Sequence, residues 1–201
     1  MKQARARLTR AIILDAGAEV FEAHGFAATN LQAVIDRTGL TKGALYGHFS
    51  SKSALALAVV DSFETSWREM TADARLSTRP ALQTLHWLTL ELTRRMAEDI
   101  RFMAGLRLSM EAARPSRTEE PHLAELRGLV TSLVTLSQEQ GDLPPEHHPD
   151  LIGRLLIALV LGTRESCSGG AGDDALGLLR SMWDTVLPAL RNVPVRPPVP
   201  R

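Results

Sequence analysis

Apolar residues recur at helical spacing along nearly the whole chain. Between residues 8 and 23, the side chains that fall on one helical face are Ile12, Ile13, Ala16, Val20 and Phe21. Gly25 follows this segment and predicts its end, because glycine adopts a left-handed backbone without a Cβ clash. No segment shows the two-residue alternation of a β-strand, so the pattern predicts an all-α fold.

Two short helices are predicted next, each preceded by a residue suited to an N-cap. Asn30 caps a helix over about 31–37, and Thr41 caps one over about 42–48. Gly39 lies in the tight turn between them, where a positive φ is needed. Ser50 or Ser51 then caps a longer helix that reaches about residue 73.

Five further helices complete the pattern, so the chain is expected to contain about nine. Their approximate ranges are 80–97, 101–112, 122–140, 149–165 and 173–190, with proline- and glycine-rich clusters between them. Residues 191–201 form a proline-rich tail that cannot continue a helix. The expected division is an N-terminal domain over 1–52, a helical body over 53–190, and the tail over 191–201.

Composition fits a globular protein and excludes several classes. The chain has 201 residues, of which 44% are hydrophobic and 23% charged, so it can bury a core without covalent links. The single cysteine, Cys167, excludes an intrachain disulfide and suits the cytoplasm. No run of about 18 apolar residues predicts a membrane span.

Charge is unevenly distributed on a chain whose net charge is zero. Residues 1–55 carry seven lysines and arginines against four acidic residues, and nothing acidic precedes Asp15. A basic N-terminal region suits a polyanionic partner, although an excess of three is also within chance.

Residues 40–55, LTKGALYGHFSSKSAL, carry the most specific pattern. Two short helices joined by a turn with glycine describe a helix-turn-helix. Leu45 and Phe49 face the core, and the polar residues between them stay outside. The small residues Gly43 and Ala44 let this helix approach base edges closely.

This run resembles the DNA-binding segment of the TetR family of transcriptional repressors, whose pattern is approximately G-[VL]-[ST]-K-G-x-[LIV]-Y-x-H-F followed by a polar pair, Lys and Leu. The matching positions are Gly39, Leu40, Thr41, Lys42, Gly43, Leu45, Tyr46, His48, Phe49, Lys52 and Leu55. The resemblance covers residues 8–60 and implies a regulator that binds a double-stranded DNA operator.

The resemblance also implies roles for individual residues. Thr29 matches a phosphate-contacting position, and the recognition helix is matched by Thr41, Lys42, Gly43 and Tyr46. His48 and Lys52 match positions that contact the DNA backbone. Tyr46 packing on the core and His48 capping the next helix remain alternatives, and the N-terminal arm could contact DNA or lie in solvent.

Family members dimerise through their last two helices, which implies a homodimer and a palindromic operator. Here those helices are about 149–165 and 173–190, with Leu179 and Trp183 among the interface residues. A buried central helix of a monomer is the alternative for the apolar run LIGRLLIALVLGT.

The body resembles, over short segments, the γ-butyrolactone receptor branch of the same family. The resemblance implies a small-molecule effector such as a γ-butyrolactone. An antibiotic is the alternative, because Leu126 stands where those receptors carry a tryptophan. The candidate ligand-binding residues are Trp87, Phe102, Met103, Leu106, Met110, Leu126 and Thr163. Each could instead be ordinary core, and Thr163 could bond within its own helix.

No catalytic constellation accompanies these patterns. The chain lacks G-x-S-x-G, a glycine-rich phosphate loop and H-E-x-x-H, so an enzyme, a metal site and a cofactor are not expected. A sensor or partner-binding regulator that does not bind DNA is the alternative function; loss of Lys42 or Tyr46 would have favoured it.

Overall fold

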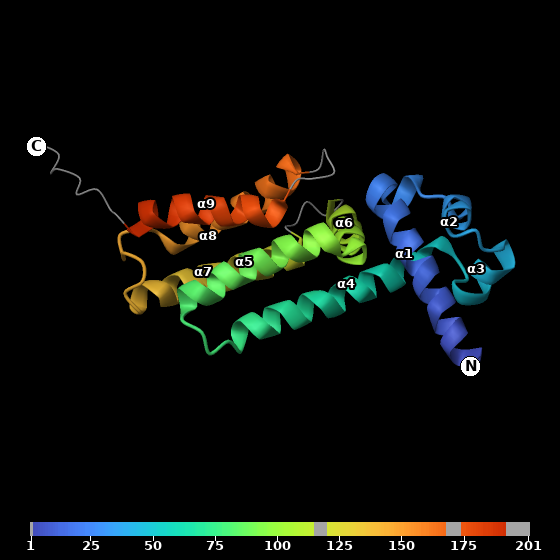
Figure 1. The fold of residues 1–201 in the computed structure, drawn as a ribbon, viewed down its shortest axis with the longest axis horizontal. Helices are drawn as coiled ribbons and strands as arrows, with labels where there is room; N and C mark the ends of the chain where they lie inside the picture. Colours follow the sequence, from blue (N-terminus) through green and yellow to red (C-terminus); the bar gives the residue numbers. More distant parts are fainter. Residues whose placement is uncertain (1, 115–119, 168–173, 192–201) are drawn as a thin grey trace, which may run out of the picture. The chain divides into compact units, whose positions relative to one another are not determined.

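A computed structural model describes residues 2–114, 120–167 and 174–191 (Figure 1). Within those ranges the chain forms nine helices and no strand, which confirms the all-α prediction. The helices are α1 (Lys2–Ala28), α2 (Leu31–Thr38), α3 (Lys42–His48), α4 (Lys52–Arg75), α5 (Ala81–Glu98), α6 (Ile100–Ala113), α7 (Pro121–Glu139), α8 (Pro149–Ser166) and α9 (Ala175–Arg191).

The chain divides into two compact units, which differ from the predicted functional domains in their extent. The first unit comprises Met1–Glu69 and Arg95–Glu120, and the second comprises Met70–Arg94 and Pro121–Arg201. Helices α4 and α5 therefore contribute residues to both units. The functional boundary at residue 52 stays a prediction, and the tail after Arg191 lies outside the described residues.

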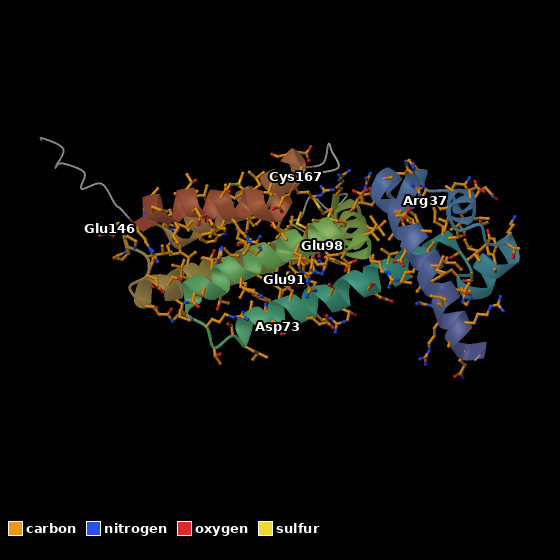
Figure 2. The ribbon with its side chains drawn as sticks, viewed as in Figure 1. Arg37, Asp73, Glu91, Glu98, Glu146 and Cys167 are labelled. Carbon is orange, nitrogen blue, oxygen red and sulfur yellow. The ribbon has the colours of Figure 1, made fainter. Side chains whose placement is uncertain are left out.

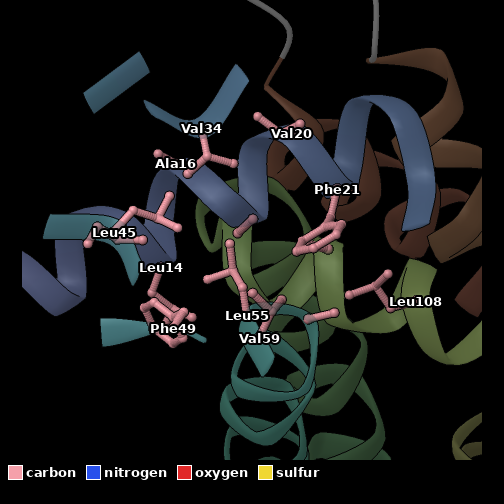
Figure 3. Close-up of a cluster of buried hydrophobic side chains, with 14 residues drawn as sticks. Leu14, Ala16, Val20, Phe21, Val34, Leu45, Phe49, Leu55, Val59 and Leu108 are labelled. Carbon is pink, nitrogen blue, oxygen red and sulfur yellow. The ribbon is translucent and has the colours of Figure 1, made fainter. Parts of the chain in front are cut away.

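The core of the first unit holds the helix-turn-helix. Its buried members include Ile13, Leu14, Val20, Phe21, Val34, Leu45, Phe49, Leu55, Val59 and Leu108. Figure 3 shows side chains of α1, α4 and α6 converging around Phe21. Each fully buried side chain of this size stabilises the fold by about 1.5–3 kcal/mol. The α2–α3 pair is therefore fixed to a rigid support.

Close helix contacts in this unit depend on glycine. A Cβ on Gly105 of α6 would lie 2.2 Å from the Cβ of Phe63 on α4. Phe63 also meets Phe102 edge-on, with ring centroids 5.1 Å apart. Larger residues at position 105 would force α4 and α6 apart.

The second unit buries the tryptophan of α9 inside the chain. Trp183 is 3% exposed, and its Nε1 donates a hydrogen bond of 2.9 Å to Thr89 Oγ1 on α5. Leu179, one turn earlier, is fully buried. The expectation that both residues form the dimer interface is therefore wrong, because the face of α9 that carries them packs onto its own chain.

Candidate DNA-binding site

The exposed face of α3 is formed by the residues that the sequence pattern singled out. Thr41 Oγ1 accepts a hydrogen bond of 3.2 Å from the Ala44 N–H, which confirms the predicted N-cap. Leu45 and Phe49 are buried and hold the helix on the core. We name the exposed residues Thr41, Lys42, Gly43 and Tyr46 the α3 surface.

Tyr46 belongs to this surface and not to the core. Its side chain is 45% exposed, so the alternative of packing on the three-helix core is excluded. Lys42 Nζ lies 5.9 Å from the centroid of the Tyr46 ring. This cation–π contact holds the lysine and the ring next to each other on the exposed face of α3.

The α2 helix fixes the angle at which α3 leaves the core. Gly39 adopts φ 64° and ψ 12°, and its N–H donates to Ile35 O at 3.0 Å. Asn30 accepts from Gln32 N–H at the other end, as predicted. Arg37, labelled in Figure 2, pairs with Glu19 of α1 at 2.8 Å and ties the two helices together.

Lys52 is placed differently from the remaining candidates. Its Nζ donates to three carbonyl oxygens, those of Phe26 (2.8 Å), Thr29 (3.0 Å) and Ala27 (3.3 Å). The ammonium also lies 4.6 Å from the centroid of the Phe26 ring. These contacts use all three donors of the lysine to fasten the end of α1 to the start of α4.

Thr29 and His48 also lie apart from the α3 surface. Thr29 is 4% exposed, and its hydroxyl donates to Gly25 O at 2.6 Å. His48 is half-buried in the last turn of α3. Their predicted contacts with phosphate stay predictions, whereas the α3 surface is presented to solvent directly.

A polar junction that the sequence did not predict joins α6 to the end of α1. Gly25 adopts φ 72° and ψ 177°, a conformation essentially confined to glycine, and this interrupts α1 as the sequence predicted. Beyond the interruption, the Phe26 N–H donates to Glu111 Oε2 at 2.9 Å. Arg107 donates to Glu111 Oε1 at 3.1 Å and to Glu22 O.

The electrostatics of this junction favour an ionised Glu111. Burial raises the pKa of Glu111, but the Phe26 N–H and the Arg107 guanidinium outweigh it and hold that pKa below its ordinary value. The i,i+4 spacing of Arg107 and Glu111 by itself indicates no more than a pair on one helix surface. Only the contacts of this pair with Glu22 and Phe26, which are distant in sequence, reveal that it positions the end of α1.

The seven candidate ligand-binding residues are divided between the units. Phe102, Met103, Leu106 and Met110 belong to the first unit, and Trp87, Leu126 and Thr163 to the second. Of these, Met110 is 39% exposed, while Phe102, Leu126 and Thr163 are buried. Thr163 Oγ1 donates to Leu159 O at 2.7 Å, the intrahelical bond anticipated as its alternative.

Comparisons with known proteins agree with this geometry. Residues 13–59 match the family described as bacterial regulatory proteins, tetR family. The A-factor receptor protein of Streptomyces griseus is 31% identical over 195 residues, covering 95% of this chain and 67% of the relative. The chain belongs to the TetR family. It is therefore a DNA-binding transcriptional regulator and not an enzyme, as the sequence analysis predicted.

Solved structures of TetR-family proteins share the fold. CprB from Streptomyces coelicolor superposes with a TM-score of 0.74 at 30% identity, covering 96% of this chain and 93% of CprB. CprB in complex with its operator superposes with a TM-score of 0.68 at 30% identity, covering 95% of this chain and 91% of CprB. No helix in the described ranges is long and apolar enough to span a membrane.

Proposed function

We propose that this TetR-family regulator is a dimeric repressor, which binds a palindromic operator through α3 and is released by a small molecule. The observation that carries the proposal is the α3 surface. Its threonine, lysine and tyrosine are exposed together at the start of a helix held on a rigid core. The backbone N–H groups at the start of α3 also favour phosphate oxygens. The proposed site of action of the repressor is the cytoplasm, where operator DNA lies.

The exposed apolar face of α8 supports the dimeric part of this proposal. The exposed face of α8 carries Leu151 (65%), Leu155 (38%) and Leu161 (45%), together with the exposed small residues Ala158 and Gly162. An exposed row of leucines at helical spacing is typical of a surface that binds another protein chain. Nothing lies within 4 Å of a Cβ built on Gly162, so a partner helix can approach closely there. We call this row the α8 stripe.

Two copies joined by the α8 stripe would present two α3 surfaces. A two-fold dimer places its recognition helices in successive major grooves, which is why the proposed operator is palindromic. The alternative of a sensor that does not bind DNA is not favoured, because Lys42 and Tyr46 are both present and exposed.

The proposed effector is a γ-butyrolactone or an antibiotic. Similarity to the A-factor receptor and to structures named γ-butyrolactone receptors supports the lactone. By the same resemblance, Leu126 stands where those receptors carry a tryptophan, which supports a different ligand shape. A ligand acts only by binding one state more tightly, and such coupling is typically about 1–3 kcal/mol.

Operator binding tests the DNA-binding role. Lys42→Ala is expected to weaken operator binding by about 10-fold, because it removes one base-edge or phosphate contact. If Lys42 contacts a phosphate, the slope of the logarithm of the operator-binding constant against the logarithm of salt concentration is expected to become shallower by about one. Fluorescence anisotropy at several salt concentrations would measure both effects, and unchanged binding would contradict the role of the α3 surface.

Lys52→Ala is the matched lysine substitution for this experiment. Because Lys52 Nζ donates hydrogen bonds to three carbonyl oxygens, its loss is expected to lower the free energy of unfolding by about 1–3 kcal/mol. The salt dependence of operator binding is expected to stay unchanged. A reduced salt slope with normal stability would instead place Lys52 on DNA phosphate.

Release is tested with the operator complex. A panel of γ-butyrolactones and antibiotics, titrated into the complex, is expected to contain a compound that lowers operator affinity by about 5- to 150-fold. A compound that binds the dimer without changing operator affinity would argue against release as its mechanism.

A further inference from the structure

A cavity lies next to the polar junction at the end of α1, within the first unit. Its volume is about 600 Å³, inside the range of small-molecule sites. Three helix segments line it: the end of α1, the start of α4 and the end of α6. None of the seven candidate effector-binding residues is among its lining residues. We call it the junction cavity.

The walls of the junction cavity are almost entirely aliphatic. Phe26 supplies the single aromatic ring, and Leu57, Val60 and Leu108 supply most of the remaining apolar surface, with small alanines between them. Leu57 is 64% exposed and Phe26 36% exposed, so the cavity opens to solvent at this side. A flexible alkyl body would bury apolar surface that the protein alone leaves in water.

Charge at the rim favours an anion. Arg114 lines the cavity, and its charge helps to lower the pKa of Glu111 without a hydrogen bond or ion pair between them in the described ranges. Glu111 is the single lining carboxylate, and its two oxygens already accept from the Phe26 N–H and from Arg107. A cationic ligand would therefore meet two arginine charges beside one carboxylate whose oxygens are already used, whereas a carboxylate ligand could accept hydrogen bonds from the Arg114 guanidinium.

From these contacts we infer that the junction cavity binds a monocarboxylate with a medium-length aliphatic body, its carboxylate on Arg114 and its chain against Leu57, Val60 and Leu108. This site is separate from the proposed effector site, because it shares none of the seven candidate effector-binding residues. The bound chain would touch Phe26, whose N–H and carbonyl are both held by the polar junction and Lys52. The ligand would thus contact the segment that leads from α1 into the helix-turn-helix.

Calorimetric titration of the full chain with decanoate tests the inference. Decanamide has the same chain without the charge, and decylammonium reverses the charge. Decanoate is expected to bind at one site, with decanamide about 10-fold weaker and decylammonium weaker again. No binding of decanoate, or equal binding of decanoate and decanamide, would overturn the inference.

Two substitutions locate the binding, and a third is the control. Arg114→Gln is expected to make decanoate and decanamide bind equally, because only the carboxylate contact is removed. Leu57→Glu is expected to abolish decanoate binding, whereas Leu76→Glu, at a leucine that is 81% exposed and outside the cavity, is expected to retain it. Both leucines are exposed, so neither change removes core packing. Binding to Leu57→Glu at the wild-type level would place decanoate elsewhere and refute the proposed site.

Discussion

Leu155→Arg is expected to convert the proposed dimer into a monomer and to lower operator affinity by at least about 100-fold. Leu155 lies in the middle of the α8 stripe, where arginine would put two like charges into a two-fold interface. A monomer would contact one half-site, so the gain from binding two half-sites at once would be lost. Sedimentation velocity and operator binding, measured on the same sample, would test both expectations.

Leu136→Arg provides the matched control. Leu136 is 42% exposed, close to the 38% of Leu155, but it lies on α7 and outside the α8 stripe. It is expected to leave both the dimer and the operator affinity unchanged. If Leu155→Arg remained dimeric and bound the operator normally, the α8 stripe would not be the interface. If it became monomeric yet bound with full affinity, the two-half-site mechanism would be contradicted.

Gly25→Ala is expected to lower the free energy of unfolding by about 2–3 kcal/mol. The backbone at Gly25 has φ 72°, which strains any residue with a Cβ, and that Cβ would lie 2.3 Å from Glu111 Oε1. Adopting an ordinary conformation would break the Phe26 N–H contact with Glu111. Urea unfolding monitored by circular dichroism would measure the change.

Gly128→Ala is the glycine control, because Gly128 lies in α7 with open space around it. Alanine there is expected to stabilise the helix by about 1 kcal/mol.

Combining Gly25→Ala with Glu111→Ala separates the cost of the positive φ at Gly25 from the cost of the close contact with Glu111. Removing the glutamate side chain relieves the close contact and leaves the positive φ, so the double variant is expected to be less destabilised than the sum of the singles. Strict additivity would exclude the contact with Glu111 as a cause.

The sequence alone predicted about nine helices, the caps of α2 and α3, and the family, but it placed the start of α1 near residue 8, whereas α1 begins at Lys2. Periodicity and capping act over a few residues, so the ends of α2 and α3 were predicted within one residue, and Asn30 and Thr41 cap them as expected. The same local chemistry predicted a helix end at Gly25, where the structure has a break inside α1. The resemblance to the TetR pattern selected the four residues of the α3 surface, and all four are exposed.

Only the tertiary structure decided which long-range partners these residues meet. Lys52 was matched to a phosphate contact by its place in a motif, yet three carbonyls at the end of α1 surround its ammonium. The sequence analysis placed Trp183 in the dimer interface, yet its indole is buried and donates a hydrogen bond to Thr89 of the same chain. A helical pattern tells which face is apolar, but not whether that face meets its own chain or another molecule. That choice depends on packing between segments far apart in sequence, and the junction cavity beside Glu111 and Arg114 arises from the same packing.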